Sequence, residues 1–379
     1  MENNELKINV LERQTFYNIG KMIERDSKST TYKFALLRGV IDVIQENSPY
    51  ISIKNDLVEI PFGLLIEKWL IYYYPIFESE LNIPQINGNN NLSFQTLLED
   101  LIQFYKNRGG FSAFYNDLRN KRIPESYQKE FYKLVKKLKQ TIYGMPMKHI
   151  GRSFNQEYYS IFQNQQSSQR SSSVKDILCL INNFGTFSIP IQYYEAFKII
   201  GSFINGQDSI LFNWAEFSVR ATKDNLSIES VLKDVLKSPI TERNISQSKT
   251  FYKKVLKNHG SVTCVWTGKK IYKYDIDHVI PFSIWKNNDL WNLLPSTSTI
   301  NKHKRDKIPS PDFIESRKDI ILDYWEIIYE SSEERFQKEI QKALLGYNSS
   351  ESWREKGISQ LKESCDYLIE TRGYESWSI

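Results

Sequence analysis

The sequence predicts a mainly α-helical protein that contains one small β patch. Apolar residues recur every three or four positions along most of the chain, which is the spacing of a helix with one buried face. The composition is that of an ordinary globular protein, with 40% hydrophobic and 14% aromatic residues. Since the chain has 379 residues, it is long enough for two or three domains.

The first 247 residues are predicted to form a mainly helical region that regulates the protein or binds a partner or nucleic acid. The helical stripes lie at residues 34–44, 66–73, 94–105, 131–142, 194–203, 210–217 and 231–236. Pro61 precedes the second stripe, and Ser93 and Asp208 are candidate N-caps of the third and the sixth. The segment Lys237–Ser248 is the expected linker to the rest of the chain.

Two extended stretches interrupt these helices. They lie around Ser153–Phe162 and Asp176–Ser188, on either side of the Ser/Gln-rich segment Gln163–Ser173. This pattern predicts a β-hairpin or a two-stranded patch joined by a mobile loop. Near the other end of the chain the helical spacing returns at residues 313–329, 333–345 and 351–371, so residues 313–379 are predicted as a C-terminal helical segment.

The adjacent residues Asp277 and His278 carry side chains that suit the hydrolysis of a phosphodiester. They lie in the β-rich run Y-D-I-D-H-V-I, and neighbouring side chains on a strand point to opposite faces. We therefore expect a division of labour. Asp277 would bind Mg²⁺, which stabilises charge on the phosphate and the leaving oxygen, and His278 would act as general base on the attacking water.

Further residues follow this pair at fixed spacings. Pro281 and Ser283 complete the pattern D-H-x-x-P-x-S, and Asn292 and Asn301 follow fourteen and twenty-three residues after His278. The stretch from about Lys249 to Pro309 thereby resembles an HNH nuclease. It is most similar to the branch whose third position is Asn, which is also found in Cas9-type effectors.

The resemblance implies a ββα-metal module over residues 248–312, with Mg²⁺ (or Mn²⁺) as cofactor and cleavage products that carry 5′-phosphate and 3′-hydroxyl ends. It gives Asn292 a supporting role in the catalytic site, in which its amide bonds the loop backbone around His278. It makes Asn301 the second metal ligand. We expect a hairpin of residues 261–266 with residues 272–280, and a helix that begins near Ser298.

His303 is an alternative to Asn301 as the second metal ligand. Residues two positions apart on a helix lie about 200° apart around its axis, so the two side chains cannot bind one ion unless the helix is broken there. The spacing favours Asn301, and His303 otherwise becomes a phosphate contact or a solvated helix residue.

The cysteines argue against a structural zinc ion. Cys179, Cys264 and Cys365 are widely separated, and Thr267 stands where a C-x-x-C pair would place its second cysteine. Cys264 is therefore expected to be a buried packing residue on the first strand of the module. Three scattered cysteines also fit a reducing environment and a cytoplasmic protein.

Basic charge is concentrated around the motif. Residues 249–309 contain eleven Lys and one Arg against four Asp and no Glu, a formal net charge of +8, whereas the whole chain carries +5. Such a local excess is typical of proteins that bind a polyanion. The candidate nucleic-acid contacts are Lys269, Lys270, Lys302, Lys304, Arg305 and Lys307.

These features favour a metal-dependent DNA endonuclease. An RNA-cleaving toxin or effector is an alternative of the same chemistry, because nothing in the sequence reads a 2′-hydroxyl. A non-catalytic helical interaction subunit is an alternative of another class. Stand-alone HNH proteins of this layout resemble restriction or anti-phage effectors. One HNH module offers one active site for one strand, so cutting both strands of a duplex favours a homodimer or a protein partner bound through the helical region. No apolar run reaches the length of a membrane span, and the first 30 residues contain no signal-peptide core.

Overall fold

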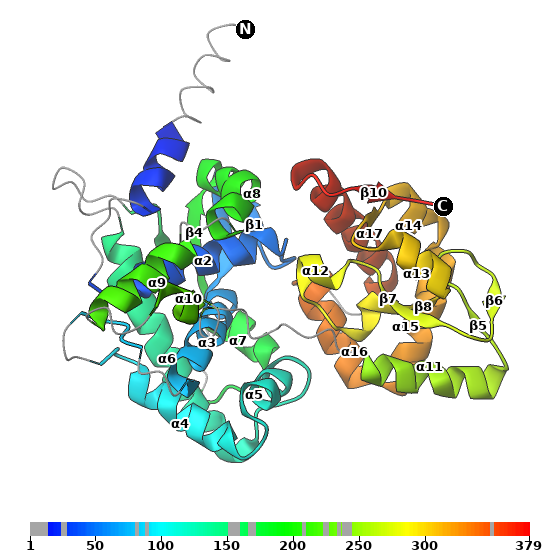
Figure 1. The fold of residues 1–379 in the computed structure, drawn as a ribbon, viewed down its shortest axis with the longest axis horizontal. Coiled ribbons are helices and arrows are strands. Elements are labelled where there is room, and N and C mark those ends of the chain that lie inside the picture. The colour runs from blue at the N-terminus through cyan, green and yellow to red at the C-terminus, as the bar shows by residue number, and fades with distance from the viewer. Residues whose placement is uncertain are drawn as a thin grey trace, which may run out of the picture. The chain divides into compact units, whose positions relative to one another are not determined.

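The structure, a computed structural model, describes residues 14–23, 29–79, 83–87, 91–150, 160–165, 172–206, 210–222, 227–232, 236, 245–348 and 352–379. The chain divides into two compact units. Unit 1 comprises residues 1–47 and 51–239, and unit 2 comprises residues 48–50 and 240–379. Both units are mainly helical, as the sequence predicts, and their strands are short (Figure 1).

Unit 1 packs its helices around an aromatic core. The helices are α2 (Tyr32–Gln45), α3 (Phe62–Glu78), α4 (Gln95–Lys106), α5 (Gly110–Arg119), α6 (Gln128–Ile142), α7 (Ile177–Asn183), α8 (Ile191–Gly206), α9 (Ile210–Ala221) and α10 (Ile228–Ser230). Tyr73 of α3 lies at the centre of the core, with ring centroids 5.1 Å from Phe94 and 5.5 Å from both Trp69 and Trp214. These large apolar rings remove more surface from water than any other side chains and hold the helices together.

A four-stranded antiparallel sheet completes unit 1. Its strands are β1 (Ser52–Lys54), β2 (Leu57–Pro61), β3 (Gln163–Gln165) and β4 (Thr186–Pro190), in the order β1-β2-β4-β3. The predicted β patch therefore exists, but it is larger than expected. Asn55 and Asp56 have φ of 48° and 63° and form the two-residue turn between β1 and β2.

Parts of the predicted patch were wrong in detail. The first half of Asp176–Ser188 is helix α7, because the side chain of Asp176 accepts a hydrogen bond from the backbone N–H of Cys179 and caps the helix. Only the second half enters β4. Residues 163–165 of the predicted loop form β3, and residues 151–159 and 166–171 lie outside the described residues.

Two cap predictions have different outcomes. Ser93 does not cap α4, because Phe94 occupies that position and the Ser93 hydroxyl lies 2.6 Å from the hydroxyl of Thr141. Asp208 lies outside the described residues, as do residues 233–235 of the stripe at 231–236 and residues 237–244 of the expected linker.

Unit 2 surrounds three small strand pairs with helices. The helices are α11 (Ser246–His259), α12 (Phe282–Trp285), α13 (Ser298–Lys304), α14 (Pro311–Ser316), α15 (Lys318–Ser331), α16 (Glu333–Ile340) and α17 (Trp353–Asp366). The strands are β5 (Val262–Thr263), β6 (Lys270–Ile271), β7 (Asp275–His278), β8 (Leu293–Ser296), β9 (Ile308–Pro309) and β10 (Ser376–Trp377), with a short 3₁₀ turn at Leu290–Asn292. The expected module and the expected C-terminal helices share one core in this unit.

The strand partners differ from the expected hairpin. β5 pairs with β6, and the turn between them contains Gly268 at a φ of 70°. β7 instead pairs with β8 in antiparallel register, with His278 opposite Leu293 and Asp275 opposite Ser296. α13 packs against β7 and α11 against β8 (Figure 1). The helix α13 begins at Ser298, as predicted, with Thr297 as its N-cap.

The end of the described chain returns to the module. β10 pairs with β9 in parallel, with Trp377 opposite Pro309. The ring of Trp377 lies edge-on to Trp266 and Phe313, with centroid distances of 5.2 and 5.3 Å. Trp266, Phe313 and Trp377, which are far apart in sequence, therefore pack together in one core beside α13. Among the described residues, no helix is long and apolar enough to cross a bilayer.

Candidate active site

Strand β7 separates the two adjacent residues of the motif. Because side chains alternate along a strand, Asp275 and Asp277 lie on one face and His278 on the other. Both Asp277 and His278 are buried, and Asp277 is only 3% exposed. The first residue of β7 thus places a second carboxylate on the same side as Asp277.

Helix α13 lies against the carboxylate face of β7. The Ser298 hydroxyl donates a 2.5 Å hydrogen bond to Oδ2 of Asp275, and the Lys304 ammonium lies 3.4 Å from Oδ1 of Asp277. Asn301 lies midway between Ser298 and Lys304, three residues from each, and such positions share one side of a helix. The contacts on either side of it therefore place Asn301 on the side of α13 that faces β7.

The carboxylate of Asp277 is held through both oxygens. The indole Nε1 of Trp266 donates a 2.6 Å hydrogen bond to Oδ2, and the Lys304 ammonium reaches Oδ1. Trp266 is fully buried, and the Lys304 ammonium lies 5.7 Å from the centre of its ring. The carboxylate is thereby fixed in position between an indole and an ammonium group, without needing to be exposed to water.

The expectation that Lys304 contacts phosphate was wrong. Its side chain is 0% exposed, and its ammonium also donates a 2.6 Å hydrogen bond to the main-chain oxygen of His278. The Lys304 ammonium therefore contacts the Asp277 carboxylate and the His278 main chain inside the protein and is not available to a phosphate at the surface. In the basic run K-H-K-R-D-K, Lys304 is therefore buried in the site, whereas Lys302 and Arg305 lie at the surface.

The residues around Asp277 suit a divalent cation. Mg²⁺ and Mn²⁺ prefer oxygen ligands, and the carboxylates of Asp275 and Asp277 and the amide of Asn301 supply them. The two carboxylates and the Lys304 ammonium together leave one excess negative charge at the site. Each carboxylate oxygen also has a second lone pair beyond the one that accepts a hydrogen bond. Since the described residues contain no cluster of three His, Cys, Asp or Glu side chains suited to a metal, an ion here would depend on Asn301 and on water for further ligands.

His278 is oriented by a residue that the sequence did not point to. Its Nε2 lies 3.2 Å from Oδ1 of Asn288, and its ring packs on Phe282 with centroids 5.7 Å apart. Oδ1 of Asn288 can only accept a hydrogen bond, so this contact suits the imidazole tautomer that carries its proton on Nε2. The second ring nitrogen, Nδ1, is buried in this structure.

Asn292 joins the loop after β7 to the start of β8. Its Oδ1 accepts a 2.8 Å hydrogen bond from the N–H of Ile280, and its Nδ2 donates a 3.0 Å bond to the oxygen of the same residue. Its own main-chain oxygen accepts from the N–H of Val279. Asn292 is fully buried and satisfies both polar groups of Ile280. It therefore acts on the backbone next to His278, not on a bound molecule.

His303 points to a different neighbour. Its Nδ1 accepts a 3.4 Å hydrogen bond from the indole of Trp377, and its side chain is exposed. The contact is to β10, whereas the contacts of Ser298 and Lys304 are to β7. His303 is therefore less suited than Asn301 to be the second ligand of an ion at Asp277.

Two of the three cysteines, Cys264 and Cys365, lie in the buried core of unit 2. None of the three forms a disulfide, and both Cys264 and Cys365 are buried. Burial raises the pKa of the Cys365 thiol to about 12, so this sulfur stays protonated and apolar. Cys264 is a packing residue beside β5, which agrees with its expected role.

The other candidate contacts to nucleic acid are at the surface. Lys269 and Lys270 lie at the β5–β6 turn, and Lys302 and Arg305 lie on α13 and just after it, all of them exposed. Lys307 forms a 2.5 Å ion pair with Glu375. Four of the six candidate cations are thus exposed and available for contacts with phosphate.

Sequence reasoning missed three residues that support this site. Asp275 could have been found from the alternation D-I-D, which places two carboxylates on one strand face. Trp266 and Asn288 carry no local signal, because the contacts that give them a role cross between separate segments.

Two family models match different parts of the chain. Residues 264–310 match the HNH endonuclease family, and this range contains β6 to β9 and every motif residue. The chain therefore carries a nuclease domain of the HNH type. Residues 12–235 match a domain of unknown function, DUF8808, over more than half of the chain, so the protein belongs to that family. No curated protein matches the chain.

Proposed function

We propose that this protein is a divalent-metal-dependent endonuclease that cuts DNA. The observation that carries the proposal is the arrangement of β7, β8 and α13. It brings Asp277, His278 and the face of α13 that bears Asn301 together within the range that matches the HNH family. The same unit carries the exposed cations Lys269, Lys270, Lys302 and Arg305.

Each residue has a distinct part in the proposed reaction. Asp277 and Asn301 would hold Mg²⁺ or Mn²⁺, and Asp275 adds negative charge beside them. When bound, the ion would stabilise charge on the scissile phosphate and on the leaving oxygen. His278 would take the proton of the attacking water, and Asn288 orients the imidazole ring through its contact with Nε2. Asn292 holds the backbone of Ile280 and so fixes the chain next to the base.

The biological setting is part of the proposal. A nuclease that meets DNA inside a cell must be restrained, and unit 1 is the part of the chain available for a partner, for dimerisation or for regulation. Defence against foreign DNA fits such an assembly, and three cysteines without disulfides fit a cytoplasmic protein. Light scattering during size-exclusion chromatography, with cleavage measured against protein concentration, tests the dimer.

The activity is tested with purified protein, plasmid DNA, single-stranded DNA and RNA, each with Mg²⁺, Mn²⁺ or EDTA. We expect cleavage of DNA with either metal, none with EDTA, and none by His278→Ala under any condition. Cleavage of RNA alone would identify an RNA-cutting effector, and cleavage that persists in EDTA would exclude a metal-dependent reaction. Wild-type protein without activity on any of the three substrates would favour the non-catalytic subunit.

A further inference from the structure

The segment between Asn287 and Leu293 supports both sides of the candidate site. Asn288 bonds the imidazole of His278, and Asn292 bonds both main-chain groups of Ile280. Leu290 lies midway between these two asparagines, two residues from each. Whatever fixes the main chain at Leu290 therefore controls the positions of both supporting amides.

A carboxylate from the C-terminal helices makes this contact. Glu339 of α16 is 2% exposed, and its Oε2 accepts a 2.6 Å hydrogen bond from the N–H of Leu290. Its Oε1 accepts a 2.5 Å bond from Nε of Arg335 on the same helix. Two N–H donors thus converge on one buried carboxylate, and both fit its ionised form.

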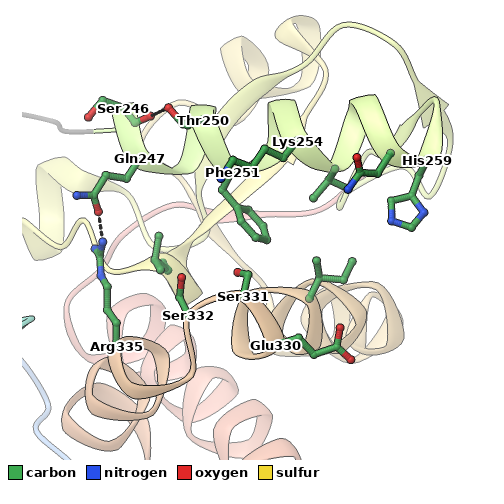
Figure 2. Close-up of a pocket in the computed structure, with 14 residues that line it drawn as sticks. Ser246, Gln247, Thr250, Phe251, Lys254, His259, Glu330, Ser331, Ser332 and Arg335 are labelled. Atoms are coloured by element: carbon green, nitrogen blue, oxygen red, sulfur yellow. Dashed lines mark hydrogen bonds between the residues drawn. The ribbon is translucent and has the colours of Figure 1, made fainter.

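Arg335 connects this carboxylate to the surface. Its guanidinium also donates a hydrogen bond to the side chain of Gln247 on α11 (Figure 2). Arg335, Gln247 and Leu290 border a cavity of about 630 Å³ between α11 and helices α15 and α16, whose other lining residues include Phe251 and Lys254. Since the Arg335 side chain is 25% exposed, it can be changed with less disturbance of the core than Glu339.

Two neutral groups hold the same segment. The Trp325 indole donates a 2.8 Å bond to the oxygen of Trp291, and the Tyr252 hydroxyl donates a 3.0 Å bond to the oxygen of Leu293. Neutral groups carry out this task at a small desolvation cost, whereas a buried carboxylate is costly. Burial, together with the nearby Asp289 carboxylate, raises the pKa of Glu339 to about 8, and Arg335 acts in the opposite direction. A costly ionisable group where a neutral one would suffice is typical of functional sites.

We infer that Glu339 is a positioning residue for the nuclease, which fixes the Leu290 backbone and thereby sets the places of Asn288 and Asn292 beside His278. The inference rests on the proposed function for its kinetic readout. It makes α16, which lies outside the range that matches the HNH family, part of the working site. The charged groups that face Glu339 are Arg335 on its own helix and Asp289 on the segment that it holds.

The test compares Glu339→Gln with Glu333→Gln, a control on the same helix whose carboxylate is exposed and bonds Tyr329 and Gln337 instead. Cleavage of DNA is measured from pH 6 to 9, together with thermal unfolding. At pH 9, where the wild-type carboxylate is ionised, we expect Glu339→Gln to lower kcat at least tenfold with KM within twofold of wild type, without a lower unfolding midpoint. The wild-type increase of kcat through pH ~8 should disappear in Glu339→Gln and persist in Glu333→Gln.

A second variant and a second readout keep the inference testable if Glu339→Gln does not fold or if the wild type does not cut. Arg335→Gln removes a positive charge, so the increase of kcat should move to higher pH. The NMR signal of the His278 ring, assigned with His278→Gln, should shift in either variant and stay in place in Glu333→Gln, with or without cleavage. An unshifted ring signal overturns the inference. A kcat within twofold of wild type in an active enzyme, or a loss of kcat matched by a loss of folded protein, also overturns it. Wild-type inactivity with a shifted ring signal rejects the proposed function alone.

Discussion

The ammonium group of Lys304 donates a 2.6 Å hydrogen bond to the main-chain oxygen of His278. The same group lies 3.4 Å from the carboxylate of Asp277, so one buried cation connects α13 to both residues of the motif. From the sequence, Lys304 is expected at the surface with its basic neighbours. The helix has only seven residues, and the side that carries Asn301 must continue to Lys304, which brings the lysine inside.

Loss of this cation should destabilise unit 2. Lys304→Met keeps the length and volume of the side chain but leaves the buried carboxylate of Asp277 without its charged partner, which typically costs about 3–5 kcal/mol. Lys302→Met, two residues earlier and exposed, should change the free energy of unfolding by less than about 0.5 kcal/mol. Chemical denaturation of both variants checks this. Equal stability of the two would mean that the buried pair does not contribute to folding.

His278→Ala should abolish DNA cleavage but leave DNA binding unchanged. The proposed base typically contributes ~10²–10⁴-fold to the rate, while substrate binding depends on cations elsewhere. Single-turnover cleavage and binding of uncut DNA in EDTA measure the two effects separately. Cleavage at a near wild-type rate would exclude His278 as the base.

Replacing the two asparagines near His278 should have different effects: Asn292→Ala should mainly lower stability, and Asn288→Ala should mainly lower the cleavage rate. Asn292→Ala leaves the buried N–H and oxygen of Ile280 without their partners and should cost about 2–4 kcal/mol of folding free energy. Asn288→Ala should cost less than about 1 kcal/mol, because its site is partly exposed, and should lower kcat. Denaturation curves and cleavage rates of both variants test this separation. The assignment of roles fails if Asn288→Ala is the less stable variant.

The exposed cations of α13 should control the salt dependence of binding. The double variant Lys302→Ala/Arg305→Ala should weaken DNA binding and reduce the slope of log K against log salt by about 0.9 for each DNA phosphate that the variant no longer neutralises. Lys133→Ala/Lys136→Ala on α6 of unit 1 removes the same charge from exposed positions and is the control. A slope that is identical in both variants would mean that α13 does not bind phosphate.

Stability should decrease as the pH rises toward 8. The pKa of Glu339 is raised by burial and by Asp289 from its ordinary value of 4.5 to about 8. The folded state therefore keeps a proton that the unfolded chain loses, and the folding free energy contributed by this proton is lost between these two pH values. Unfolding midpoints of wild type and Glu339→Gln, compared at pH 5 and pH 8.5, check this. The variant should gain relative to wild type at pH 8.5, and a gain only at pH 5 would contradict the assignment.

Much of the local structure could be predicted from the sequence. The helical stripes correspond to α2, α3, α4, α6, α8 and α9 and to the C-terminal helices, because a buried helical face repeats regularly. The start of α13 at Ser298 agrees with the prediction, whereas the functional roles of Asp277, His278 and Asn292 remain predictions that rest on the motif and on the family resemblance. The β1–β2 hairpin could have been found from Asn55-Asp56, a turn pair between two β-rich stretches.

The strand partners could not be predicted. β7 pairs with β8 across a long connection, and strand propensity shows which residues favour a strand but not which strand lies beside it. The apolar run after Asp176 is equally compatible with a buried strand and a short helix, and its cap decides for α7. The roles of Trp266, Lys304 and Glu339 depend on contacts between distant segments, which have no signature in any one segment.

The pairing of β10 with β9 determines when, during synthesis, the core beside the proposed active site can be completed. A growing chain folds from its N-terminal part onward, so unit 1 can assemble while unit 2 is still being synthesised. The strand next to α13 lacks its partner, and the Trp266 and Phe313 rings lack their cover, until Trp377 has emerged from the ribosome. Nascent chains and prematurely terminated products would therefore contain the motif without a finished core around it. The order of synthesis alone would therefore delay the proposed DNA cleavage until unit 1, and any restraint that it provides, has folded.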